Sequence, residues 1–105
     1  MYSYVYFITD NNGHIKIGKA DNTVKRLNEL QTGNPYKLSI ILTVMMPSIN
    51  DAFSLEQELH QLFKDYRLEG EWFEAEPVLK VIDVDIVKLN KFQFGGLKYG
   101  KVKEV

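Results

Sequence analysis

The feature that most constrains this chain is its opening, where two runs of β-branched and aromatic residues flank a cluster of Asp, Asn and Gly. The runs cover residues 4–8 and 14–19. Such a pattern predicts a β-hairpin whose loop is longer than two residues. Because side chains alternate along a strand, the core face is expected to carry Val5, Phe7, Ile15 and Ile17. The opposite face then carries Tyr4, Tyr6, Ile8, His14, Lys16 and Gly18. A phenol, an imidazole and an ammonium on that face indicate a polar ligand.

The composition is that of one globular domain. The chain has 105 residues and a hydrophobic content of 45%, enough for a core of its own. The absence of cysteine excludes disulfides, thiolate metal sites and a Cys nucleophile, and favours a reducing compartment. No apolar run is long enough to span a bilayer, and the opening lacks the pattern of a signal peptide. We therefore expect a cytoplasmic protein with no membrane partner.

The charges are unevenly distributed although the net charge is only −1. Residues 1–47 and 88–103 are mainly basic, whereas residues 48–87 hold ten acidic residues against three basic ones. If both ends fold to one side, they can hold a polyanion such as DNA. Solvated faces and a frayed tail would give the same distribution, so charge alone leaves both interpretations open.

A helix and a strand are expected after the hairpin. Asp21 or Asn22 can cap a helix of about three turns. Gly33 suits its C-terminal cap, and Pro35 cannot continue it. Residues 38–46 are nearly all apolar, which predicts a strand at the centre of the sheet, covered on both faces. The apolar stripe of the helix consists of Val24, Leu27 and Leu30.

A second helix follows Pro47 and is expected to be the main packing element against the sheet. Ser48 or Asn50 can cap it, and Glu69-Gly70 ends the helical segment. Residues 71–73 then read as a short extended piece, in which Trp72 and Phe73 are expected to cover the core. The apolar stripe of the helix consists of Ala52, Leu55, Leu59, Leu62, Phe63 and Tyr66.

A third helix is expected to begin near Pro77, with Leu79, Ile82, Ile86 and Leu89 as its seam. Residues 81–86 also alternate as a strand would, so that alternative stays open. We divide the chain into one domain over residues 1–91 and a basic, Gly-containing tail over residues 92–105. Disorder is the expectation for that tail, with a grip on nucleic acid as the alternative.

Glu56 and His60 stand one helical turn apart on the second helix and project together beside the sheet. A carboxylate at the edge of a core is a suitable ligand for a hard cation such as Mg²⁺. An imidazole changes its charge near neutral pH, so His60 can carry a proton. An ordinary i, i+4 pair on a half-exposed helix would look the same.

An ordered series of motifs resembles the GIY-YIG nuclease superfamily. The resemblance is closest to the branch found in phage DNA-binding proteins and in a meiotically up-regulated fungal family. It extends from residue 4 to about residue 74. The matching segments are Tyr4-Val5-Tyr6, Lys16-Ile17-Gly18, Arg26, residues 30–35, Leu55-Glu56, Leu59-His60, Phe63, Arg67 and Glu71-Trp72-Phe73.

This resemblance implies a small α/β (α+β) fold, with a three-stranded antiparallel sheet flanked by three helices, that cuts DNA phosphodiesters with one Mg²⁺ or Mn²⁺ ion. By position, Tyr6 lies near the attacking water or acts as its base, and Arg26 contacts the scissile phosphate. Glu56 holds the metal. His60 is a further catalytic candidate, and either it or Tyr6 can take the proton of the water. An arginine fork can bind two phosphate oxygens, which agrees with these roles.

The expected nucleic-acid contacts are Lys19, Lys25, Asn34 and Arg67. Lys16 stands where the second motif usually has tyrosine, and it is either a base or a phosphate ligand. Tyr4 replaces the usual glycine of the first motif, and the late asparagine of the superfamily has no counterpart. A catalytically inactive DNA-binding module is therefore the alternative function, and a protein-interaction domain is a third. So small a module leaves target specificity to self-association or to a fused or partner domain.

Overall fold

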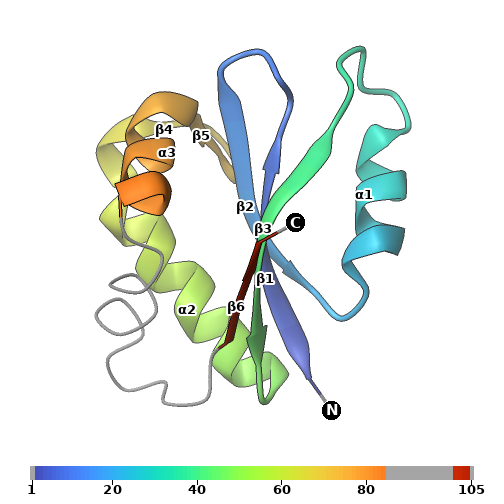
Figure 1. The fold of residues 1–105 in the computed structure, drawn as a ribbon, viewed down its shortest axis with the longest axis vertical. Helices are drawn as coiled ribbons and strands as arrows, with labels where there is room; N and C mark the ends of the chain where they lie inside the picture. Colours follow the sequence, from blue (N-terminus) through green and yellow to red (C-terminus); the bar gives the residue numbers. More distant parts are fainter. Residues whose placement is uncertain (1, 85–100, 105) are drawn as a thin grey trace.

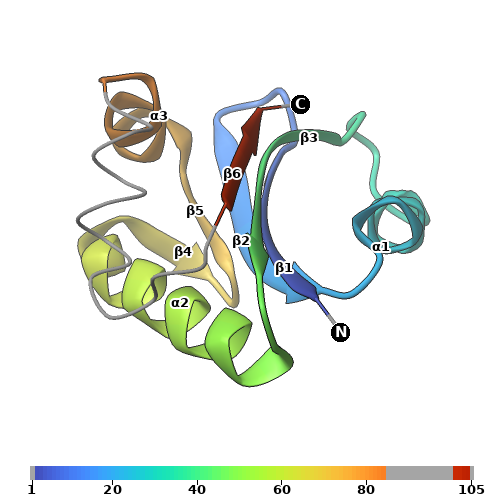
Figure 2. The same ribbon diagram turned by 60° about the horizontal axis from the view of Figure 1, so that its bottom comes forward.

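The structure is a computed structural model that describes residues 2–84 and 101–104. It has three layers, with an antiparallel sheet in the middle (Figures 1 and 2). Helix α1 (Thr23–Gln31) covers one face of the sheet, while α2 (Ile49–Leu62) and α3 (Ala75–Val84) cover the other. The predicted mixed α/β class is confirmed.

The described part of the sheet has six strands, in the order β4-β5-β2-β1-β3-β6, and each pairing is antiparallel. The predicted number of three is therefore wrong, because short strands extend both edges. Those short strands have only three or four residues, too few to show a periodicity. The strands are β1 (Ser3–Thr9), β2 (His14–Ala20), β3 (Ser39–Met46), β4 (Arg67–Glu69), β5 (Trp72–Glu74) and β6 (Lys101–Glu104).

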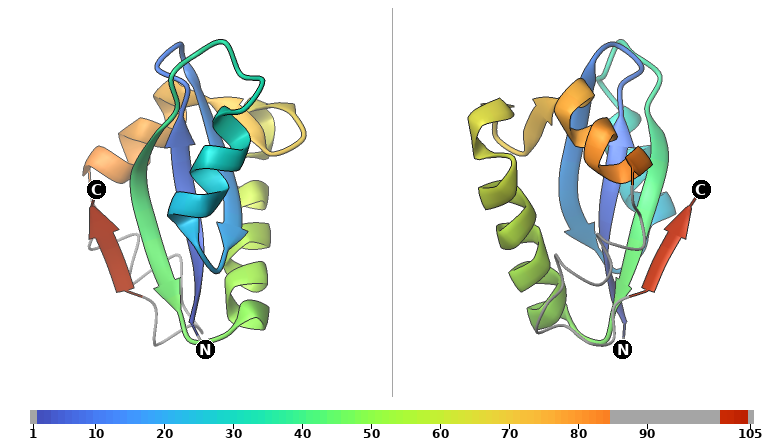
Figure 3. Two further views of the ribbon diagram at one scale, coloured as in Figure 1. Left: turned by 90° about the vertical axis from the view of Figure 1, so that its right-hand side faces the viewer. Right: turned by 60° about the vertical axis from the view of Figure 1, so that its left-hand side comes forward.

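The predicted hairpin is confirmed as β1 and β2, and β1 rather than β3 is the centre of the sheet. Strand β1 pairs along its length with β2 on one side and with β3 on the other. Strand β3 has only the four-residue β6 beyond it (Figure 3), so its predicted central position is wrong. Its apolar run instead reflects packing, because its residues join the apolar clusters on both faces of the sheet.

The predicted core face of the hairpin is confirmed, since all four of its residues are fully buried against α2 and α3. The opposite face is not simply a polar binding face. Tyr6 and Ile8 on that face are also buried, because Leu27 and Leu30 of α1 pack over them. The polar groups of this face are therefore concentrated toward the edge where β2 meets β5.

The N-terminal helix caps are as predicted, but the apolar stripes are shorter, and the second helix ends at Leu62 instead of at Glu69-Gly70. The side chains of Asn22 and Ser48 accept hydrogen bonds at the starts of α1 and α2. Val24, in the first turn of α1, is 65% exposed. Leu62 and Tyr66 are also exposed, because α2 ends at Leu62 and a 3₁₀ turn (Lys64–Tyr66) follows it.

The third helix is confirmed as α3, whereas its predicted seam residues Ile86 and Leu89 lie outside the described residues. The division of the chain at residue 91 also lies there and stays a prediction. Residues 101–104 of the expected tail form β6, paired with β3. None of the described helices is long and apolar enough to cross a membrane.

Candidate functional site

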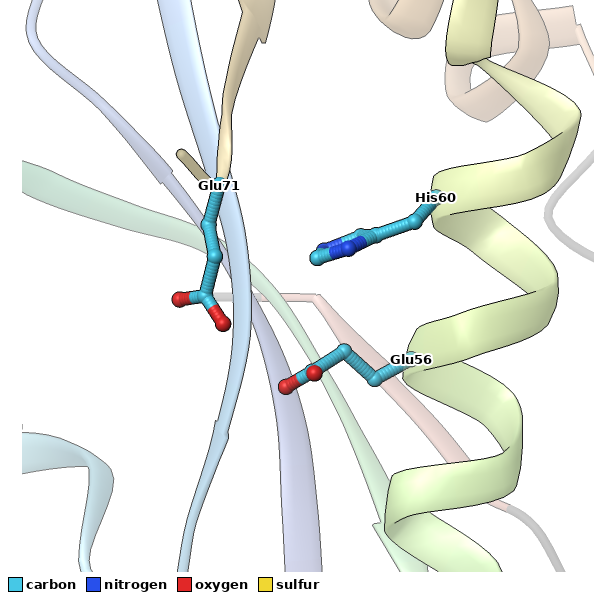
Figure 4. A group of neighbouring side chains, drawn as sticks. All are labelled: Glu56, His60 and Glu71. Carbon is cyan, nitrogen blue, oxygen red and sulfur yellow. The ribbon is translucent and has the colours of Figure 1, made fainter. Parts of the chain in front are cut away.

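Three potential metal ligands meet at the edge of the sheet beside β2. Glu56 and His60 project from α2, and Glu71 projects from the turn between β4 and β5 (Figure 4). One ligand atom from each residue lies within 4.8 Å of the other two. The predicted convergence of Glu56 and His60 is therefore present, and a second carboxylate joins them.

The turn that carries Glu71 has its own supports. Gly70 has a φ of 57°, a left-handed conformation that favours glycine. Arg67 Nε donates a 2.6 Å hydrogen bond to the Gly70 carbonyl oxygen. The Ile17 N–H then donates to the Glu71 carbonyl oxygen at 3.0 Å. These bonds fix the backbone of Glu71 against β2, and its side chain lies close to those of Glu56 and His60 (Figure 4).

Glu56 is a buried carboxylate with little compensation. It is 5% exposed, and within the described residues it forms no salt bridge and receives one side-chain hydrogen bond, at 3.3 Å from Gln57 Nε2. Burial raises the pKa of Glu56 above its ordinary value, and the charge of Glu71 adds to the shift, against the opposing effects of His60 and Lys19. A cation between the two carboxylates would supply the missing compensation.

His60 is held in one tautomer by the sheet. Its Nε2 donates to the Ile17 carbonyl oxygen at 2.8 Å, so the lone pair of the neutral ring is on Nδ1. The ring also packs against Phe73, with centroids 5.1 Å apart. A bond from the second ring nitrogen to a backbone carbonyl is the usual support of a metal-binding or proton-accepting histidine.

Lys16 forms an ion pair with Glu71 on the other side of that carboxylate. Its Nζ lies 3.1 Å from Glu71 Oε1 and 5.7 Å from the centroid of the Trp72 ring. The side chain is largely buried between these two partners. Trp72 packs against the apolar cluster beneath α1, and Phe73 lies in the main core beneath α2 and α3. Both residues therefore cover the core, as expected, and do not form an open stacking platform.

Tyr6 and Arg26 bring a hydroxyl and a guanidinium to the same edge. Burial raises the pKa of the Tyr6 hydroxyl, the neighbouring Arg26 guanidinium opposes the shift, and the charges of Glu71 and Glu56 reinforce it. The raised pKa makes this tyrosine a hydrogen-bond donor at neutral pH rather than a ready base. Arg26 Nη1 lies 3.6 Å from Glu29 Oε1. The Arg26 side chain is nevertheless partly exposed, so part of its guanidinium is accessible.

The four predicted nucleic-acid contacts are dispersed. Lys19 lies beside the cluster, where its charge acts on Glu56. Lys25 is on the exposed side of α1. Asn34 shapes the loop before β3, since its Oδ1 accepts from the Tyr36 N–H at 2.9 Å. Arg67 supports the turn of Glu71 instead of pointing away as a free cation.

Sequence reasoning missed Glu71 as a ligand, although it noticed the segment. The signal that marks it is an acidic residue directly between a turn glycine and a short strand. Such an acid can be recognised as a possible ligand only when the pairing of β5 with β2 is known. This pairing ends at Lys16 and Trp72, which places Glu71 just beyond the last pair. The site therefore opens where β2 continues past its neighbour, at Gly18.

The fold is thus a small antiparallel α+β domain whose sheet edge carries two converging carboxylates and a hydrogen-bonded histidine, close to Lys16, Lys19 and Arg26. The chain belongs to the T5orf172 domain family, whose model matches residues 1–89. That family is GIY-YIG-like and related to homing endonucleases, and it is consistent with a nuclease-like or DNA-binding module. Comparisons with curated proteins and with solved structures gave no match.

Proposed function

We propose that this protein is a divalent-metal-dependent DNA endonuclease module of the GIY-YIG type. The observation that carries the proposal is the convergence of Glu56, His60 and Glu71, with ligand atoms within 4.8 Å of one another, in a member of this family. Tyr6 and Arg26 flank this cluster and offer a hydroxyl and a guanidinium to a phosphate.

The donor set fits a Mg²⁺ or Mn²⁺ ion. Carboxylate oxygens are ligands that both ions accept. Glu56 would hold the ion together with the Glu71 oxygen that Lys16 leaves free. When bound, such an ion would neutralise charge on the phosphate and on the leaving oxygen.

The chain's own residues would position the phosphodiester and receive one proton. Arg26 binds two non-bridging oxygens through its planar fork. The Tyr6 hydroxyl donates a hydrogen bond to the phosphate, because its raised pKa keeps it protonated. The Nδ1 lone pair of His60 accepts the proton of the attacking water, and the Ile17 carbonyl oxygen stabilises the imidazolium that forms.

A plasmid-nicking assay tests the proposal. Wild-type protein with Mg²⁺ or Mn²⁺ is expected to convert supercoiled DNA to nicked circles. Glu56→Gln should lose at least about 100-fold of this rate, since a ligand is removed without a change of shape. Glu58→Gln, an exposed change on the same helix, should nick like wild type. Unchanged nicking by Glu56→Gln would reject the metal assignment.

A catalytically inactive DNA-binding module is the second candidate function. The pairing of Lys16 with Glu71 favours it, because that ammonium is already neutralised and stands where the superfamily usually has a tyrosine. Salt-dependent DNA binding without nicking in either metal would support this candidate over the nuclease.

A further inference from the structure

An exposed aromatic ring lies on α2 next to the carboxylate cluster. Phe53 is 52% exposed, one helical turn before Glu56 and on the same side of the helix, with His60 one turn further on. Ile49, one turn earlier, is exposed as well. The stripe on α2 thus changes from apolar to acidic at the site, and the ring of Phe53 stands at that border.

Lys19 of β2 approaches the same ring. Its Nζ lies 5.9 Å from the centroid of the Phe53 ring, a cation–π distance. Lys19 follows Gly18, at the free end of β2 where the site opens, and its charge also acts on Glu56. A half-exposed ring beside a cation matches the two parts of a nucleotide, which are a flat base and a charged phosphate.

We propose that Phe53 and Lys19 form a subsite for an unpaired nucleobase next to the scissile phosphate. Phe53 and Glu56 are three positions apart on α2, a rise of about 4.5 Å, which places the ring next to the proposed metal ligand. A base inside a duplex has both faces covered, so only an unpaired or displaced base can lie on the ring. The substrate is therefore DNA with a bulge, gap or single-stranded segment.

This inference rests on the proposed function for the position of the scissile phosphate, but base binding can be measured without cleavage. The probe is a pair of short fluorescein-labelled duplexes, one fully paired and one with a single-nucleotide bulge, followed by fluorescence anisotropy in Ca²⁺. Wild-type protein should bind the bulged duplex more tightly. Phe53→Ala should weaken binding to the bulged duplex about tenfold, as expected for loss of one base–aromatic stack, and binding to the paired duplex less than about twofold.

Two further variants make the result specific. Phe53→Trp keeps a flat ring and should retain the preference for the bulge. Ile49→Ala removes a neighbouring exposed apolar side chain and should bind both duplexes like wild type. Because both positions are exposed, folding should be unchanged, which far-UV circular dichroism and thermal melting check.

The outcomes separate this inference from the proposed function. A wild type without preference for the bulge, or equal losses on both duplexes in Phe53→Ala, would overturn the subsite. An equal loss in Ile49→Ala would overturn it too and indicate a general apolar contact surface. If wild type fails to nick plasmid but Phe53→Ala loses the bulge selectively, the subsite stands on a DNA-binding module and the nuclease proposal fails. If wild type nicks plasmid but Phe53→Ala changes the affinity for neither duplex, the nuclease proposal stands and the subsite is overturned.

Discussion

The Tyr6 phenol occupies the space that a side chain at Gly18 would need. The two residues are directly opposed on β1 and β2. A Cβ added to Gly18 would lie 2.4 Å from the Tyr6 hydroxyl oxygen and 2.6 Å from its Cζ, with Glu71 Oε1 at 3.0 Å. The glycine of the second motif thus makes room for the tyrosine of the first, and it keeps the hydroxyl at the edge where the carboxylates meet.

Gly18→Ala should therefore destabilise the protein by about 1–3 kcal/mol, the usual cost of overpacking a tightly packed interior. Urea unfolding monitored by circular dichroism measures this change. Tyr6→Leu removes the phenol ring. In that background, Gly18→Ala should lower the free energy of unfolding clearly less than it does in the wild-type background. Additive effects of the two substitutions would contradict the contact, because residues that collide are coupled.

Glu56→Gln should raise the melting temperature of the metal-free protein at pH 7. The pKa of Glu56 is raised mainly by burial, so its charged form is less favourable in the folded chain than in the unfolded one. Wild-type stability should accordingly rise as the pH falls through the raised pKa, and the advantage of glutamine should shrink there. Differential scanning fluorimetry at several pH values without divalent ions measures both.

The same experiment with metal should give the opposite order of melting temperatures. Addition of Mn²⁺ should stabilise wild type, because the ion binds the folded state, but not Glu56→Gln. The exposed control Glu58→Gln should follow wild type in both series. If metal-free Glu56→Gln melts below wild type at pH 7, groups of the protein already stabilise the charged carboxylate of Glu56, and no bound cation is needed to do so.

Lys16→Met should bind Mn²⁺ more tightly than wild type. Lys16 and a metal ion compete for the charge of Glu71, and the pair is separated by only 3.1 Å. Loss of this ion pair should improve Mn²⁺ affinity by about two- to fivefold, the equivalent of roughly 0.5–1 kcal/mol. Isothermal titration calorimetry measures the affinity, with Lys25→Met on the exposed side of α1 as control. Weaker Mn²⁺ binding by Lys16→Met would mean that the ammonium positions Glu71 as a ligand instead of competing for it.

The parts of this fold that local chemistry controls were predictable from sequence. Turn residues and alternation located the hairpin, cap residues located the starts of α1 and α2, and helical spacing brought Glu56 to His60. Features that depend on which segments pair were not predictable. Glu71 becomes a ligand only through the pairing of β5 with β2, and three-residue strands leave no period to detect. Burial of Ile8 required the knowledge that α1 folds over that face.

Asp10→Asn should destabilise the hairpin in a pH-dependent way. Asp10 is buried, which opposes its charge, but its carboxylate accepts a 2.6 Å hydrogen bond from His14 Nδ1 and bonds from the backbone N–H groups of Asn12 and His14 at 2.8 and 3.1 Å. These bonds outweigh burial and lower the pKa of Asp10 below its ordinary value. The charged form therefore stabilises the folded chain.

The stability that this charge contributes is present at pH 7 and is lost as the pH falls below about 4 and through the lowered pKa. We expect Asp10→Asn to cost about 1.5–3 kcal/mol at pH 7, the range for loss of a hydrogen bond to a charged group, and much less at pH 3. Urea unfolding at the two pH values measures the difference, with Asp21→Asn as the exposed control. Acid removes only the charge of Asp10. An equal loss of stability in Asp10→Asn at both pH values would therefore mean that the shape of the side chain, and not its charge, holds the loop.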